Sequence, residues 1–171
     1  MKNSISILLC FSLLTCLSLN LYSQSAENEL DQVKLTKQLI GTWETRVGED
    51  SIIQLTCTPF GEGIRGQFEW KSDGKVYRES AMVIGFSADR KTIVFTIVGD
   101  DGATTHDIGR FVAEKKWVTE RFFSDSPLHA HALVEMEFPT PTTLKYSWCG
   151  RGTNITWEPQ WESTLTYTKI K

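Results

Sequence analysis

The sequence lacks the short motifs that mark several common enzyme classes. It has no Gly-x-Ser-x-Gly nucleophile elbow, no His-Glu-x-x-His pattern and no glycine-rich phosphate-binding loop. Cys57 would need an adjacent base and partial exposure to act as a nucleophile, and its position among apolar strand residues indicates neither. We therefore assign no catalytic residue from the sequence.

Clusters of basic residues are also missing. The formal net charge is −3, and the longest basic runs are the pair Arg90 and Lys91 and the pair Lys115 and Lys116. Nucleic acids and anionic lipid surfaces attract proteins through larger basic clusters. We expect neither of them as a partner.

A long uncharged run occupies the N-terminus. Lys2 is followed by the mostly apolar segment 5–19, and the next charged residue is Glu27. Together with small residues near position 23, this pattern predicts a cleavable signal peptide over residues 1–23, and hence a periplasmic or secreted protein. A retained span would want about 20 predominantly apolar residues, whereas serine, threonine and asparagine interrupt this run. We expect no membrane span after cleavage.

Only four cysteines are present, and two of them, Cys10 and Cys16, lie in the predicted signal peptide. Lipid anchoring through either one is the less favoured alternative, because neither follows a small residue. Cys57 and Cys149 remain, and their strand parities differ relative to the apolar faces, which argues against converging side chains. Free thiols are favoured over a disulfide, although an oxidising compartment keeps the bridge open.

A short helix is expected before the strands, within a lead-in over residues 24–38. Ser25 can cap its N-terminus, and acidic residues near the start and basic residues near the end suit the helix dipole. The sequence predicts that this helix ends near Lys37.

From residue 40 onward the hydrophobic pattern changes to period two. Ile64, Phe68 and Trp70 alternate with polar residues, as expected of a strand with one buried face. Ten such runs, separated by turn signals, lie at about 40–47, 51–59, 64–71, 76–86, 92–97, 104–112, 116–123, 129–138, 142–149 and 161–169.

The spacing of the turn signals bears on topology. They recur about every 10–14 residues, which suits consecutive antiparallel hairpins rather than parallel units joined by helices. Ten strands in an open sheet would expose two edges, and closure into a barrel removes them. The sequence predicts an all-β domain over residues 39–171, an antiparallel up-and-down barrel of about ten strands. A two-sheet sandwich is the alternative.

The start of the first strand resembles a known family. Gly41-Thr42-Trp43, placed after a short helix, resembles the Gly-x-Trp start of lipocalin-like (calycin) barrels, including uncharacterised bacterial lipocalin-like domains. Gly41 would permit close backbone approach, and Trp43 would plug the closed end of the barrel. Lipocalins usually carry an arginine from the last strand on this tryptophan; here only Lys169 and Lys171 are available. The resemblance implies binding of a small molecule.

Several arginines share strand parity with apolar residues. A charge directed into a barrel is costly unless it is paired or met by a ligand anion. The alternative is that these arginines lie on the solvent face or pair with Glu79, Glu120 or Asp107. The candidate ligand-binding residues are these arginines and the apolar residues of the cavity wall: Arg78, Met82, Phe95, Arg110, Arg121 and Tyr146.

We expect no metal and no cofactor. His129 and His131 share a strand face, but zinc needs at least one further ligand, for which only Glu135 and His106 are candidates.

The sequence favours an exported protein that binds a small apolar or amphipathic molecule inside the barrel. One alternative is a barrel enzyme of the isomerase or cyclase type acting on a lipid-like substrate. The other is a filled barrel that interacts through loops such as 150–160. A cavity of about 300 Å³ or more would favour the first two. The sequence indicates no oligomeric state.

Overall fold

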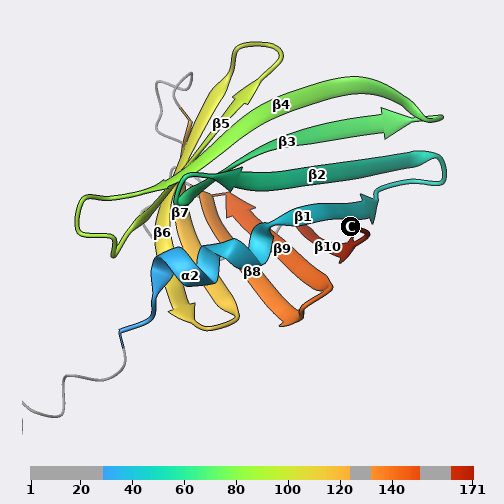
Figure 1. Ribbon diagram of the computed structural model, residues 1–171. Coiled ribbons are helices and arrows are strands. Elements are labelled where there is room, and N and C mark those ends of the chain that lie inside the picture. Colours follow the sequence, from blue (N-terminus) through green and yellow to red (C-terminus); the bar gives the residue numbers. More distant parts are fainter. Residues whose placement is uncertain (1–28, 124–131, 151–162) are drawn as a thin grey trace, which may run out of the picture.

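The computed structural model describes residues 29–123, 132–150 and 163–171, which form a closed sheet and a short helical segment (Figure 1). The helical segment is α2 (Gln32–Thr36) followed by the 3-10 turn η1 (Lys37–Leu39). The strands are β1 (Gly41–Arg46), β2 (Ser51–Phe60), β3 (Gly63–Ser72), β4 (Lys75–Phe86), β5 (Ile93–Gly99), β6 (Thr104–Ala113), β7 (Lys116–Phe123), β8 (Ala132–Thr140), β9 (Thr143–Gly150) and β10 (Ser163–Lys169).

Every strand pairs antiparallel with its neighbours in the sequence, and β1 pairs with β10. In this closing pair Trp43 lies opposite Lys169 and Glu44 lies opposite Thr168. The sheet therefore has no free edge, which is the physical advantage of closure. The predicted ten-strand up-and-down barrel is confirmed, and the sandwich alternative is excluded.

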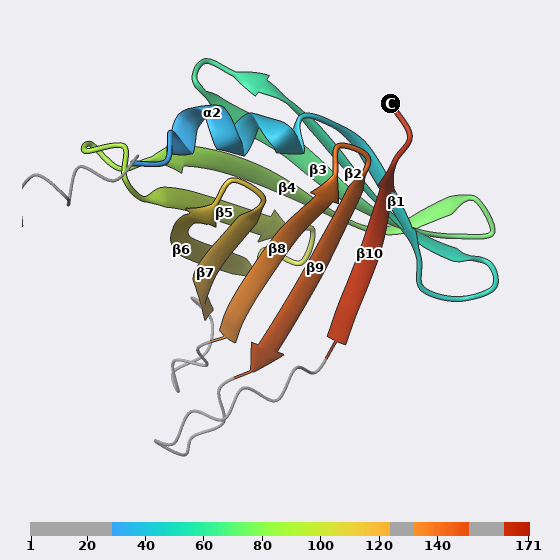
Figure 2. The ribbon, with the colours of Figure 1, turned by 90° about the horizontal axis from the view of Figure 1, so that it is seen from below.

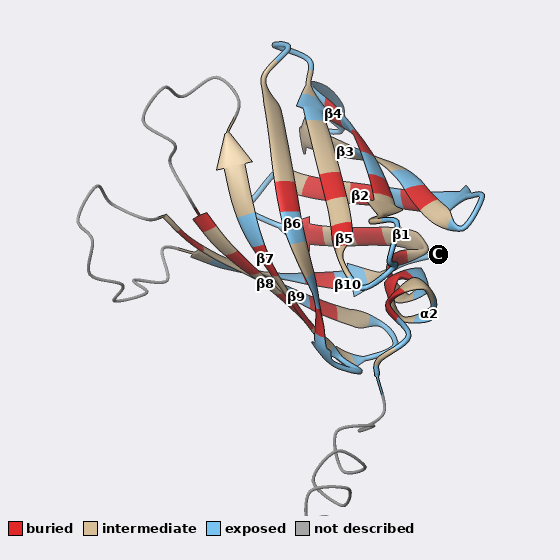
Figure 3. Ribbon diagram, turned by 90° about the vertical axis from the view of Figure 1, so that its left-hand side faces the viewer, coloured by how far each residue is buried: buried red, intermediate tan, exposed pale blue. Residues whose placement is uncertain are grey.

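Burial follows the alternation of the sequence. In β8 the residues Ala132, Val134, Met136 and Phe138 are buried, whereas Glu137 between the last two is exposed. Figure 3 shows the same banding of buried and less buried residues along the strands. Because successive side chains of a strand point to opposite faces, the buried set forms one core inside the barrel.

The helical segment begins later than the sequence predicts. Residues 29–31 are not helical, and the Asp31 side chain caps α2 by accepting a hydrogen bond from the Lys34 backbone N–H at 2.9 Å. Aspartate is as good an N-cap as serine, so it can start the helix at this point. Ser25, the predicted cap, lies outside the described residues.

The helix packs across one end of the barrel (Figure 2). The Gln32 side chain donates to the Phe111 carbonyl oxygen at 3.2 Å and accepts from the Phe111 N–H at 2.7 Å. These bonds fall where the register between β6 and β7 shifts, after Phe111. Gln32 thus supplies partners for backbone groups next to this irregularity and fixes α2 on the barrel.

Trp43 fills the same end. It has no exposed surface, its indole N–H donates to the Leu39 carbonyl oxygen at 2.8 Å, and its ring packs edge-on against Phe138. The Lys169 ammonium lies 5.1 Å from the ring centroid, within the range of a cation–π contact. Gly41 has a φ of +134°, and a Cβ there would lie 2.6 Å from the Lys171 carbonyl oxygen. Only glycine fits this approach.

No helix in the described ranges is long and apolar enough to cross a membrane. The predicted signal peptide (residues 1–23) and most of the loop 150–160 lie outside those ranges. Within them, Cys57 and Cys149 are both buried free thiols, as favoured from their strand parity.

Candidate functional site

The barrel is hollow at the end opposite Trp43. A cavity of about 290 Å³ lies among the strands, close to the 300 Å³ lower bound of typical small-molecule sites. Its lining is mainly apolar and aromatic with a few polar groups: Ile53, Phe68, Trp70, Arg78, Ser80, Ile97, Gly99, Asp101, Ala103, Thr105, Arg121, Tyr146, Leu165 and Tyr167. This composition is typical of a site for a small molecule.

The inner boundary of the cavity is formed by aromatic rings. Phe68, Tyr146 and Tyr167 also line a separate void of about 10 Å³ further inside, which is too small to hold a ligand. Met82 and Phe95 belong to this inner void and not to the cavity. Both were candidate ligand-binding residues, and the structure places them in the packed core, where Phe95 lies 6.1 Å from the Trp117 ring.

Arg121 is the buried charge at the cavity wall. It lies directly opposite Asp107 in the register between β6 and β7. Its Nε donates to Asp107 Oδ1 and its Nη2 to Oδ2, both at 2.7 Å. The Arg121 side chain is 14% exposed and that of Asp107 is 0% exposed. This bidentate geometry is the strong form of an ion pair in a protein interior.

Burial and pairing act against each other on this pair. Desolvation raises the pKa of the Asp107 carboxyl, and the hydrogen bonds and charge of Arg121 offset part of that rise. Desolvation acts to lower the pKa of Arg121, but hydrogen bonding to Asp107 and the nearby Tyr146 hold it above its ordinary value. Burial likewise raises the pKa of the Tyr146 hydroxyl. Arg121 therefore stays charged and Tyr146 stays protonated at neutral pH.

Arg78 lies at the mouth of the cavity. Its side chain is 51% exposed, and its guanidinium carbon lies 5.3 Å from the centroid of a Trp70 ring. Its Nη2 nitrogen lies 3.7 Å from Asp101 Oδ2. Trp70 is directly opposite Arg78 in the sheet. The sequence left open whether Arg78 meets a ligand or faces solvent. The structure leaves it half exposed and brings it together with Arg121 and Tyr146 around one cavity.

Two small hydroxyl residues add polarity inside the cavity. Thr105 Oγ1 is buried and has no hydrogen-bond partner, and Ser80 is 4% exposed. An unpartnered buried hydroxyl is costly unless a ligand or water satisfies it. Sequence reasoning missed Thr105 and Trp70. Trp70 shares its strand parity with Phe68, which was an available signal. No such signal marked Thr105, because both faces of its strand carry apolar residues.

Arg110 does not reach the cavity. It shares the outer face of β6 with Ile108 and Val112, both more than 40% exposed. The expectation that Arg110 points into the barrel is therefore wrong. The opposite face of β6 carries Asp107 and Phe111, which are both buried. Asp107 pairs with Arg121, and Phe111 stacks on the Trp117 ring.

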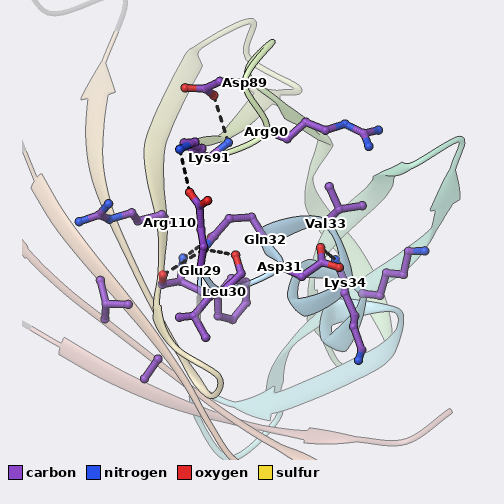
Figure 4. Close-up of a pocket in the computed structure, with 14 residues that line it drawn as sticks. Glu29, Leu30, Asp31, Gln32, Val33, Lys34, Asp89, Arg90, Lys91 and Arg110 are labelled. Atoms are coloured by element: carbon purple, nitrogen blue, oxygen red, sulfur yellow. Dashed lines mark hydrogen bonds and ion pairs between the residues drawn. The ribbon is translucent and has the colours of Figure 1, made fainter. Parts of the chain in front are cut away.

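Arg110 instead borders an outer hollow between α2, the β4–β5 turn and β6 (Figure 4). This hollow is larger, about 1010 Å³, but its rim is exposed and charged. Lys91 bonds Glu29 at 3.0 Å there, and the side chains of both are mostly exposed. Such solvated pairs are ordinary surface chemistry, so we place the functional site in the barrel cavity.

Cys57 carries no chemistry in this arrangement. It is 2% exposed, and burial raises the pKa of its thiol from 9.0 to about 12, with the charge of Lys169 opposing this rise. A thiol with such a pKa holds almost no thiolate at neutral pH, and thiolate is the nucleophilic form.

The raised thiol pKa predicts a loss of stability in alkali. The unfolded chain releases the Cys57 proton near pH 9, whereas the folded protein keeps it until about pH 12. The free energy of unfolding should therefore fall as pH rises through this window, by up to about 1.4 kcal/mol per pH unit for this group. Denaturant unfolding measures this free energy between pH 8 and pH 10, and it should fall less steeply with pH in Cys57→Ala than in the wild-type protein. The exposed neighbour Thr56→Ala should keep the wild-type slope; equal slopes in all three proteins would contradict the assignment.

Within the described ranges no group of three or more histidine, cysteine, aspartate or glutamate residues is placed to hold a metal ion. His129 and His131 lie outside those ranges, so the absence of a metal site stays a prediction.

Comparison with models of known protein families gives no match, and comparison with curated proteins gives none either. A similar solved structure is described as "Structure of EF1p2_mFAP2b bound to DFHBI". It is 14% identical, covers 80% of this chain and 94% of its own, and has a TM-score of 0.34. A likeness at this level assigns no function, so the residues of the cavity are the basis for one.

Proposed function

We propose that this protein is an exported, lipocalin-like barrel that binds a small apolar or amphipathic molecule without catalysis. The cavity of about 290 Å³ carries this proposal, because it combines aromatic walls with a buried arginine, Arg121, whose charge is paired outside the cavity. The uncharged N-terminal run supports export, and the Gly41-Thr42-Trp43 start supports the lipocalin-like assignment.

Catalysis is disfavoured by the titration of the cavity groups. An acid or base works best when its pKa lies near the operating pH. Asp107, whose pKa is raised toward neutrality, does not line the cavity, and both of its oxygens are held by Arg121. The pKa of Arg121 and that of Tyr146, which do line the cavity, are both raised, away from neutrality. Neither group can take up a proton from a substrate at neutral pH. The filled-barrel alternative is disfavoured by the cavity itself.

The binding test uses the uncharged fluorescent probe N-phenyl-1-naphthylamine. Leu165 lines the cavity from β10, and Leu165→Trp would fill part of the space. We expect wild-type protein to enhance probe fluorescence with saturation, and Leu165→Trp to weaken binding by roughly tenfold or more through lost space.

Thr166→Trp is the matched control, since Thr166 is the next residue on the same strand and is exposed. It should bind the probe as wild type does. No saturable fluorescence with wild-type protein, or equal binding by both tryptophan variants, would refute a ligand site in this cavity.

A further inference from the structure

The charge on Arg121 is already neutralised within the protein. Two of its five N–H donors go to the two oxygens of Asp107, each at 2.7 Å. An incoming carboxylate or phosphate would find this fork occupied. It would also lie close to a carboxylate that has no exposed surface, where repulsion is weakly screened. The sequence-based idea that Arg121 receives a ligand anion is therefore disfavoured by the pairing.

A cationic ligand is equally mismatched. Asp107 does not border the cavity and both of its oxygens are taken by Arg121, so its carboxylate is not available to a ligand cation. At the mouth, Arg78 and Asp101 lie 3.7 Å apart and offset each other. Among the described lining residues every charge thus has an opposite partner, and a charged ligand would lose its hydration without a free counter-charge.

The wall next to Asp107 offers hydrogen-bond donors that have no acceptor among the described residues. Arginine offers N–H groups and no acceptor, and three N–H groups of Arg121 remain for Tyr146 and a ligand. The Thr105 hydroxyl has no partner and can donate as well. Thr105 and Asp107 share the inward face of β6, and Arg121 lies opposite Asp107, which brings these donors to one side of the cavity.

We propose that the ligand has no net charge and places a hydrogen-bond acceptor, such as a carbonyl oxygen, against Arg121 and Thr105. Its apolar body lies against Phe68, Trp70 and the two tyrosines of the cavity wall. This inference rests on the proposed function and names the ligand class. Asp107 acts as the selectivity residue, because it cancels the charge that would otherwise favour anions.

Three ligands with the same aromatic body test this proposal. These are 2-acetylnaphthalene, which carries a neutral acceptor, 2-ethylnaphthalene, which carries none, and 2-naphthoate, which is an anion at pH 7.5. Each is titrated against wild-type protein loaded with N-phenyl-1-naphthylamine, and displacement of the probe gives its affinity. Because a hydrogen bond from a charged donor is involved, the ketone should bind roughly ten- to a hundredfold more tightly than the ethyl compound. The ketone should also bind at least roughly ten- to a hundredfold more tightly than 2-naphthoate.

Equal affinities for the ketone and the ethyl compound, or tightest binding of naphthoate, would overturn the neutral-acceptor proposal while leaving a cavity binder in place. If neither the probe nor any of the three compounds binds, the proposed function itself fails. The wild-type protein alone therefore separates the two failures.

A second arm uses Asp107→Asn, which keeps the side-chain shape and removes the negative charge. Arg121 would then be uncompensated, and affinity for 2-naphthoate should rise by roughly tenfold or more over wild type. Circular dichroism checks that the variant is folded. A folded variant that still rejects naphthoate as strongly as wild type does would contradict the role given to Asp107.

Discussion

Replacing Asp107 by leucine is expected to lower the free energy of unfolding by about 3–5 kcal/mol, because it leaves Arg121 as an unpaired buried charge. The partner oxygens of Asp107 lie 2.7 Å from two guanidinium nitrogens, and no exposed surface of Asp107 offers water as a substitute. Denaturant unfolding at pH 7, followed by circular dichroism, measures the loss.

The double variant Asp107→Leu with Arg121→Met is the matched control for this first prediction. Apolar residues in place of a whole buried ion pair are often neutral or stabilising. We expect the double variant to regain most of the lost stability. If the losses in the free energy of unfolding caused by the two substitutions are instead additive, the cost of Asp107→Leu comes from packing and not from an unpaired charge on Arg121.

Trp43→Ala is expected to cost about 3–5 kcal/mol, the range for removing a large aromatic side chain from a core. Trp43 has no exposed surface, and the change would also leave the Leu39 carbonyl oxygen without its indole donor. Thermal and denaturant unfolding measure the effect.

Two comparisons separate the contributions at this end of the barrel. Trp43→Phe keeps most of the volume and loses the hydrogen bond, so it should cost less than Trp43→Ala. Lys169→Met removes the ammonium near the ring and should cost about 1 kcal/mol or less. N-phenyl-1-naphthylamine should still bind to folded Trp43→Phe, because Trp43 does not line the cavity. A fully stable Trp43→Ala would contradict its role as the plug.

The barrel could be predicted because one rule governs most of its strands. In β8 the buried residues fall at every second position, and the same alternation in the sequence is visible without any structure. The short, regular connections indicated antiparallel hairpins, and closure was predicted because an open sheet of ten strands would expose two edges. The start of α2 could not be predicted, since Ser25 and Asp31 are both good caps and only the packing of Gln32 on Phe111 favours the later start.

The candidate site was only partly accessible from the sequence. Three of the six candidate residues, Arg78, Arg121 and Tyr146, line the cavity. The alternative that an arginine pairs with Asp107 also holds, for Arg121. The orientation of β6 could not be predicted, because both of its faces carry apolar residues and parity alone does not distinguish whether Arg110 or Asp107 faces inward. Pairing across strands decides the orientation, and the register that brings Asp107 opposite Arg121 is a property of the folded sheet.

The seam between β1 and β10 joins the first and the last of the described strands. Past the end of β10, the Thr42 N–H of β1 donates to the Lys171 carbonyl oxygen at 2.8 Å, and the Ile170 N–H donates to the Thr42 carbonyl oxygen at 2.8 Å. These contacts join residues that are far apart in the sequence, so forming them carries a large cost in loop-closure entropy. A nascent polypeptide that stops before β10 would thus be an open sheet with β1 and β9 as unpaired edge strands. Protection from edge-to-edge aggregation would then depend on the pairing of β10.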